Sequence, residues 1–179
     1  MADRAACARG VPGGDAAGGA GAVVKVSRKQ LRLTDEELEQ FLTENTYGRL
    51  ATANHEGEPH LTPLGYVYHD GAIWFHALRG GRRDRDLAEN PKVAFLVDDG
   101  LGPDDTYSDR RGAILYGTCG VADDDPRLDD VRYAFMRAMG AATVAEIQRR
   151  THSWYRIDVA RSSSWDFRKI PAGADRKAK

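Results

Sequence analysis

Cysteine is scarce in this sequence, and long apolar runs are missing from it. The two cysteines, Cys7 and Cys119, lie far apart and form neither a CxxC pair nor a disulfide framework. No uninterrupted apolar stretch approaches the roughly 20 residues that cross a bilayer. Residues 1–22 also lack the apolar core of a signal peptide. We therefore expect a soluble protein in a reducing, cytoplasmic compartment, with no membrane partner.

An excess of basic residues is missing as well. The 179 residues include 26 Lys and Arg against 27 Asp and Glu, which gives a formal net charge of −1. Nucleic-acid-binding domains are usually strongly basic, so this balance argues against a nucleic-acid partner. The five histidines show no HxH or HExxH spacing, so no metal site is predicted.

The hydrophobic pattern predicts one domain at residues 31–170, between flexible tails at 1–30 and 171–179. Thr34 and Glu37 match a capping box, which begins a helix that extends from Asp35 to about Asn45. Further helices are expected at 82–89, 125–140 and 144–148, and strands at 47–54, 60–68, 72–77, 92–97, 112–122, 154–160 and 162–167. Short strands with few interposed helices indicate an antiparallel barrel rather than a doubly wound sheet.

For two of these strands the sequence also predicts burial or an irregularity. The run KVAFLV at 92–97 is continuously apolar, which predicts burial on both of its faces. Gly117 and Gly120 interrupt the strand at 112–122, and glycine inside a strand suggests a bulge or a bend.

Four arginines fall within the seven residues from Arg79 to Arg85. Such a cluster can form a nucleic-acid patch, a solvated charged face or a phosphate cradle. On a helix over 82–89, Arg82 meets Asp86 at i+4. Arg85 meets Glu89 at the same spacing, so each of these two arginines has an acidic partner one turn away.

Arg83 differs, because its i+4 neighbour is Leu87, which marks the inward face of the helix. Arg83 also lies in the first turn, where the helix dipole disfavours a cation and favours a bound anion. Gly80 and Gly81 would let a ligand approach the backbone closely. Asp86, at i+3, offers Arg83 an alternative partner. From spacing alone, a solvated charged turn and a phosphate site both stay open.

A family resemblance covers most of residues 34–170. It is carried by GRLATANHEGEPHLTPLGYVYHDGAIWFHA and RRDRDLAENPKVAFLV, which resemble the pyridoxamine 5′-phosphate oxidase-like, FMN-binding split-barrel family. The segments DTYSDRRGAILYGTCGVADD and RSSSWDFRKI are similar to its actinobacterial branch, which uses flavins or a deazaflavin coenzyme (F-420 type). The resemblance implies a split β-barrel, an oxidoreductase activity and a homodimer with the cofactor at the subunit interface. By position, Arg83 matches the family residue that binds the flavin phosphate.

The same resemblance implies a set of cofactor-binding residues. They are Thr52, His60, Thr62, Pro63, Phe75, His76, Ala77, Arg82, Arg83, Trp165 and Arg168. The alternative for the strand residues is ordinary packing. The alternative for Trp165 and Arg168 is a tryptophan that fills the barrel and an arginine paired with Asp166. No catalytic acid or base is implied, because the cofactor carries the hydride chemistry.

The favoured function is a reductase that uses the deazaflavin coenzyme or FMN on a small organic substrate. The deazaflavin coenzyme carries a polyglutamate tail, for which Lys25, Arg28, Lys29 and Arg32 offer a basic cluster; a solvated linker explains that cluster equally well. One alternative is a non-catalytic carrier of flavin, haem or another tetrapyrrole. Another is a nucleic-acid binder that uses the arginine cluster.

Overall fold

The structure, a computed structural model, describes residues 26–147 and 149–171. Seven strands form one sheet in the order β2-β1-β5-β6-β7-β4-β3, and every neighbouring pair is antiparallel. The strands are β1 (Tyr47–Ala53), β2 (Pro59–Gly65), β3 (Val67–His69), β4 (Ala72–Leu78), β5 (Lys92–Asp99), β6 (Arg111–Val121) and β7 (His152–Asp166). The predicted class, mainly β and antiparallel, is confirmed.

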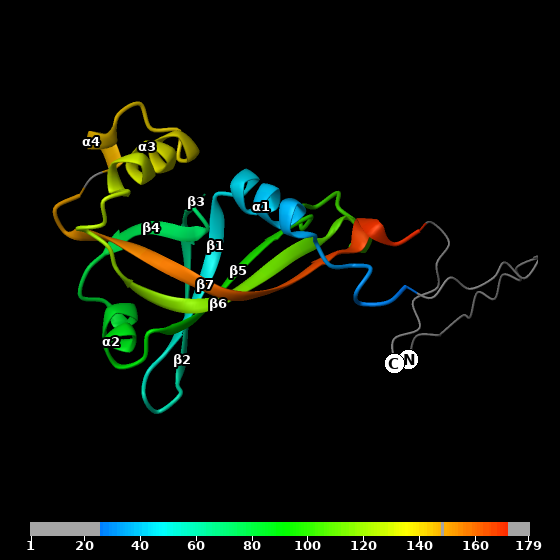
Figure 1. The fold of residues 1–179 in the computed structure, drawn as a ribbon, viewed down its shortest axis with the longest axis horizontal. Coiled ribbons are helices and arrows are strands. Elements are labelled where there is room, and N and C mark those ends of the chain that lie inside the picture. Colours follow the sequence, from blue (N-terminus) through cyan, green and yellow to red (C-terminus); the bar gives the residue numbers. More distant parts are fainter. Residues whose placement is uncertain (1–25, 148, 172–179) are drawn as a thin grey trace, which may run out of the picture.

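Helices flank this sheet (Figure 1). In the described part of the chain they are α1 (Asp35–Glu44), α2 (Arg82–Glu89), α3 (Leu128–Ala138) and α4 (Val144–Ile147), with 3-10 turns at Tyr107–Asp109 and Phe167–Lys169. α1 contacts β3, α2 contacts the β1–β2 hairpin, and α3 packs beside α4 and β3. α2 occupies the residues predicted for it, 82–89.

The sheet curls until β2, at one edge, contacts β4 near the other edge. Its concave face holds the main hydrophobic core, in which Leu50, Phe95 and Ile157 are fully buried beside Phe41 and Leu42 of α1. Each such side chain stabilises the fold by about 1.5–3 kcal/mol relative to an exposed position. A curled, incompletely closed antiparallel sheet is the split barrel that the family resemblance implied.

α3 covers the opposite face of the sheet at β4 and β7. Leu128, Val131 and Phe135 of α3 are buried against Trp74 and Trp154. The ring edge of Phe135 meets Trp154 with 5.3 Å between centroids. β4 therefore lies between two apolar layers, and its alternate residues face two different environments.

The predicted capping box of α1 is present. Thr34 Oγ1 accepts a hydrogen bond from the backbone N–H of Glu37 at 3.2 Å, and Glu37 Oε2 accepts one from the N–H of Thr34 at 2.7 Å. The first turn of α1 is acidic, which also suits the positive end of the helix dipole.

The single strand expected at 60–68 is two strands, β2 and β3, that separate at Tyr66. β2 pairs with β1 and β3 pairs with β4, so the chain crosses from one sheet edge to the other at this residue. The backbone N–H of Tyr66 donates to Thr46 O at 2.9 Å, and its fully buried hydroxyl donates to Leu42 O at 3.0 Å. The alternating pattern of the sequence hides this crossing because both halves remain extended.

The two strands expected at 154–160 and 162–167 are instead one long strand, β7. The register between β6 and β7 shifts between Tyr116 and Gly117, and this bulge allows pairing to continue past it. A Cβ at Gly117 would lie 1.9 Å from the carbonyl oxygen of Asp158, so a side chain does not fit there. The bulge predicted at Gly117 is confirmed, whereas Gly120 pairs regularly with Arg156.

The expectation that β5 is buried on both faces is wrong for the single chain. Val93, Phe95 and Val97 are buried in the barrel, but Ala94 and Leu96 are partly exposed on the other face. Within the described residues, the middle of the outer face of β5 is thus apolar and incompletely covered, between Lys92 and Asp98 on the same face.

The tails predicted at 1–30 and 171–179 lie mostly outside the described residues, as do Lys25 and Gln148. None of the helices that the structure describes has both the length and the apolar character needed to cross a membrane.

Candidate functional site

α2 begins at a double-glycine turn that leaves its N-terminus open. Gly80 has a φ of +76°, and a Cβ at either Gly80 or Gly81 would meet no atom within 4 Å. The N-cap is Gly81, so no side chain caps the amide groups of the first turn. Such an uncapped helix start attracts anions, and phosphate in particular.

Arg83 points away from this opening and into the protein. It is 7% exposed, and its Nη2 donates to Leu78 O at 2.6 Å and to Asp84 Oδ1 at 3.0 Å. Its guanidinium lies 4.5 Å from the centroid of the Tyr155 ring. A carbonyl, a carboxylate and an aromatic ring of the same chain therefore already hold this cation.

The partner of Arg83 is Asp84, not Asp86. The Tyr155 hydroxyl donates to Asp84 Oδ1 at 2.8 Å, and the Gly80 N–H donates to the other oxygen. Burial raises the pKa of Asp84, but the hydrogen bonds from Tyr155 and Gly80 and the charge of Arg83 outweigh it and lower the pKa. The ionised Asp84 neutralises Arg83 and also accepts a hydrogen bond from the Gly80 N–H in the turn before α2.

Asp86 belongs to a second buried cluster. It lies two residues after Asp84 on α2, and side chains two residues apart on a helix point in nearly opposite directions. Asp86 is 3% exposed and accepts a hydrogen bond from Thr52 Oγ1 at 2.7 Å. His60 Nδ1 lies 3.8 Å from Asp86 Oδ2, and within the described chain this buried nitrogen has no hydrogen-bond partner. Thr52 and His60 are opposite one another in the β1–β2 register, so the cluster joins two strands to α2.

Arg82 stays accessible at the start of α2. Its side chain is 43% exposed, and its Nη2 lies 3.3 Å from Glu58 Oε2 on the β1–β2 hairpin. The predicted i+4 contact with Asp86 exists at 4.0 Å, the limit for an ion pair. Arg82 therefore presents an accessible guanidinium at this turn.

The i+4 pair predicted between Arg85 and Glu89 is absent from the ion pairs that join the described residues. Glu89 instead contacts His55 Nδ1 at 2.8 Å. Arg85 is exposed on α2.

The three predicted residues of β4 face in two directions. Phe75 and Ala77 point into the barrel core, where Phe75 stacks on Tyr155 with 5.0 Å between centroids. His76 points to the opposite face and stacks on Trp154 at 4.7 Å. The alternation of the strand thus separates His76 from its two neighbours.

Thr62 and Pro63 also lie on opposite faces, here of β2. Thr62 is opposite Leu50 of the core, so it shares the inner face with His60. Pro63 is exposed and pairs with Arg49 on the outer face. The structure therefore brings Thr52, His60 and Thr62 together and leaves Pro63 outside.

Trp165 and Arg168 lie far from α2 in the single chain. Trp165 pairs with Gly112 at the end of β7, whereas Tyr155, which touches Arg83, lies ten residues earlier on that strand. That separation corresponds to about 30 Å of extended chain. Arg168 binds Asp166 through Nε and Nη2 at 2.9 and 2.7 Å, as the non-functional interpretation of this arginine expects.

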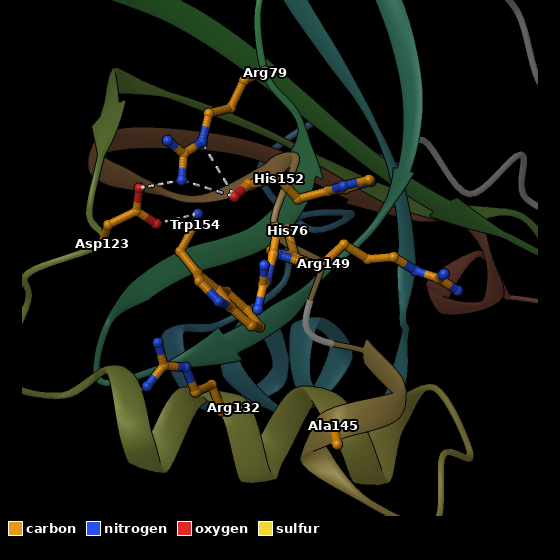
Figure 2. A pocket seen from close by; sticks show the side chains of 9 residues that line it. His76, Arg79, Asp123, Arg132, Ala145, Arg149, His152 and Trp154 are labelled. Atoms are coloured by element: carbon orange, nitrogen blue, oxygen red, sulfur yellow. Dashed lines mark hydrogen bonds and ion pairs between the residues drawn. The ribbon is translucent and has the colours of Figure 1, made fainter.

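A cavity that no sequence motif indicated lies between β4, β7, α3 and α4 (Figure 2). Its volume is about 480 Å³, and it is lined by His76, Arg79, Asp123, Arg132, Ala145, Arg149, Arg150, His152 and Trp154. These residues come from segments scattered along the chain, so no spacing pattern in the sequence marks them as a group.

The region around α2 fits a cofactor that carries a phosphate and a polar ring. The exposed Arg82 and the uncapped amides suit a phosphate, and the partly exposed side chains of His60 and Thr62 suit the polar edge of a ring. No group of three His, Cys, Asp or Glu side chains suited to a metal ion occurs in residues 26–147 and 149–171.

Comparison with known proteins agrees with this architecture. A family model described as pyridoxamine 5′-phosphate oxidase matches residues 34–166. A curated relative, the 5a,11a-dehydrotetracycline/5a,11a-dehydrooxytetracycline reductase of Streptomyces rimosus, is 40% identical over 82 residues. The alignment covers 44% of this chain and 56% of the reductase, so the chain spans about half the length of this relative.

Two solved structures share the fold. The conserved hypothetical protein Rv2991 from Mycobacterium tuberculosis has a TM-score of 0.70 and 27% identity, over 87% of this chain and 97% of that one. An FAD-binding protein from Mesorhizobium loti has a TM-score of 0.57 and 23% identity, over 74% of this chain and 94% of that one. Because the family match extends from the helix cap at Thr34 to the end of β7, it spans the whole barrel, and the chain belongs to the pyridoxamine 5′-phosphate oxidase family.

Proposed function

We propose that this protein is an oxidoreductase, specifically a reductase that uses a deazaflavin coenzyme (F-420 type) or FMN on a small organic substrate. The observation that carries the proposal is the open start of α2. There the exposed Arg82 and the amides of the first turn, which no N-cap side chain binds, follow two glycines at which a Cβ would meet no atom within 4 Å. Family membership and a relative that is named as a reductase support the same conclusion.

Each part of the α2 region has a role in this proposal. Arg82 and the first amides of α2 bind the cofactor phosphate, because both donate hydrogen bonds and carry positive charge. Arg83, which is paired with Asp84, positions the turn from the protein interior through its hydrogen bond to Leu78 O. Thr52, His60 and Thr62, which share the inner face of β1 and β2, orient the polar edge of the ring. The bound coenzyme supplies hydride transfer, so the protein needs no acid or base of its own in principle.

A homodimer completes the proposed site. Trp165 near the end of β7 and Arg168 in the 3-10 turn after it are too far to reach Arg82 of the same chain, but a second copy can bring them there. The outer face of the sheet suits such an interface, because Leu61 is 61% exposed and Ala94, Leu96 and Ile114 are partly exposed on it. Apolar patches of this kind on a folded chain mark interaction surfaces.

Between the two cofactors we favour the deazaflavin. The segment SWDFRK supports it through the resemblance described above. A carbon in place of the reactive flavin nitrogen suppresses one-electron and oxygen chemistry, which suits a reductase. Arg28, Lys29 and Arg32 are exposed in a turn beside β7, where Arg32 Nη2 donates to Ser162 O at 3.5 Å. This basic turn could receive an acidic tail.

Titration of the purified protein with FMN, the deazaflavin coenzyme and haem tests the proposal. Arg82→Gln should weaken binding of the preferred flavin-type cofactor by about tenfold or more, the effect of losing a charged hydrogen bond. Arg85→Gln, on the same helix but outside the site, should leave affinity unchanged. Equal affinities in both variants would refute the site at Arg82, and binding of haem alone would refute the flavin-type cofactor and favour a carrier.

A further inference from the structure

The cavity between β4, β7, α3 and α4 concentrates positive charge. Four guanidinium groups, those of Arg79, Arg132, Arg149 and Arg150, line it against the single carboxylate of Asp123. Arg132 reaches in from α3 and Arg79 from the end of β4, on opposite sides of the Trp154 and His76 rings (Figure 2). In a chain with a formal net charge of −1, this is a marked local excess.

The acidic groups nearby do not neutralise that excess. Arg79 lies 3.7 Å from Asp123 and also donates twice to the carbonyl oxygen of His152 at 3.2 Å. Arg132 contacts Asp129, which is 85% exposed, so water screens this pair strongly. The Nε of Arg132 is buried and has no hydrogen-bond partner among the described residues. A buried donor without an acceptor is unfavourable, so the protein satisfies the Arg132 guanidinium only in part.

Arg149 and Arg150 add two exposed cations to the same cavity. No ion pair within the described chain includes either of them. Their charges therefore face solvent or a ligand.

The floor of the cavity is a stack of rings. His76 lies on Trp154 at 4.7 Å and against His152 at 5.0 Å between centroids. Burial lowers the pKa of His76 to about 4, helped by the charges of His152, Arg132 and Arg149, while Asp123 acts in the opposite direction. The His76 ring is consequently neutral at pH 7 and provides a flat surface beneath the arginines.

We propose that this cavity binds a small polyanion, a molecule or group that carries two or more phosphates or carboxylates. Several guanidinium groups that line one cavity suit several anionic groups on one ligand, because each can form a charged hydrogen bond. A cavity of about 480 Å³ is within the range for small-molecule sites and does not suit a nucleic-acid strand. The cavity is separate from the proposed flavin-phosphate contacts, since His76 points away from Phe75 and Ala77.

Calorimetric titration of the full chain, without cofactor and at constant ionic strength, tests this inference. The probes are tripolyphosphate, citrate and tri-γ-glutamate, with acetate as the monovalent reference. We expect saturable 1:1 binding of at least one polyanion. Arg132→Gln should weaken it about tenfold or more, since a charged hydrogen bond is lost.

Arg137→Gln is the matched control, because Arg137 is exposed on the same helix and does not line the cavity. It should leave affinity within about twofold of the wild type, as surface substitutions usually do. If Arg132→Gln does not fold, Arg149→Gln replaces it, since an exposed side chain can be changed without disturbing the core. Absence of saturable binding by all three probes, or equal effects at positions 132 and 137, overturns the proposal.

A further titration, which rests on the proposed function, distinguishes two sources of the polyanion. If Arg149→Gln lowers affinity for the deazaflavin coenzyme but not for FMN, the polyanion is the acidic tail of the coenzyme. If neither cofactor affinity changes while polyanion binding weakens, the ligand is a separate molecule. A failure of this cavity leaves the Arg82 test unaffected, because the two experiments use different residues and probes.

Discussion

Arg83 is bound by its neighbour in the chain, Asp84, with 3.0 Å between Nη2 and Oδ1. The side chains are 8% and 22% exposed, so the ion pair is largely shielded from water. The basic residue that the family resemblance assigned to phosphate binding therefore already has an anionic partner. This arrangement leaves the neighbouring Arg82 as the accessible cation at the start of α2.

The Arg83–Asp84 pair predicts a large loss of stability when one partner is removed. Asp84→Asn should lower the free energy of unfolding by about 2–4 kcal/mol, because a buried guanidinium loses its counter-charge. The double variant Arg83→Met with Asp84→Asn should lose less than the sum of the single changes. Urea unfolding followed by circular dichroism measures both, with Arg85→Gln as the exposed control. Additive losses would contradict a coupled pair.

Thr52 predicts a smaller effect in the second buried cluster. Thr52→Val removes the 2.7 Å hydrogen bond to Asp86 and leaves that buried carboxylate with one donor fewer. We expect a loss of about 1–3 kcal/mol in the free energy of unfolding. Thr43→Val, which removes an exposed hydroxyl bond to Glu39 O on α1, is the control and should cost much less. Similar losses at both positions would mean that the Thr52–Asp86 bond does not stabilise the fold.

The bulge between β6 and β7 predicts a sharp contrast between two glycines. Gly117→Ala would place a Cβ 1.9 Å from Asp158 O, so the strands must shift. Overpacking of this kind costs about 1–3 kcal/mol. Gly120→Ala meets no atom within 4 Å and should be close to neutral. Thermal unfolding of the two variants checks the prediction, which fails if both melt at the wild-type temperature.

The lowered pKa of His76 predicts a pH-dependent stability. Its pKa falls from 6.5 to about 4 on folding, first because of burial and then because of nearby cationic charge. Between these two values the unfolded chain binds a proton that the folded chain does not, so folding stability decreases as the pH falls through this window. His76→Gln should reduce the difference between stabilities measured at pH 7 and pH 5.

The stability difference is measured by urea unfolding at the two pH values. His69→Gln is the control, because it leaves His76 in place and should retain the wild-type difference. An identical pH 7 to pH 5 difference in wild type and His76→Gln would show that His76 does not titrate abnormally.

Local features of the fold were readable from the sequence because their causes are local. The capping box formed by Thr34 and Glu37 requires residues three apart, and the end of α2 at Glu89 follows from Asn90-Pro91. Glycine at 117 marked the bulge, and the quoted family segments indicated the split barrel. The alternation of apolar and polar residues indicated where strands occur. It did not show that 60–68 divides into β2 and β3, or that 154–160 and 162–167 join into β7.

The sequence by itself thus determined the class of fold, the start of α1, both ends of α2 and the family. Only the tertiary structure decided which acidic residue holds Arg83, because Asp84 and Asp86 are both within reach along the chain and burial beside Tyr155 selects the first. The tertiary structure also placed His76 on the cavity side of β4 and Arg132 across from it. These relationships join residues from distant segments, and their distances depend on how the sheet curls and where α3 packs.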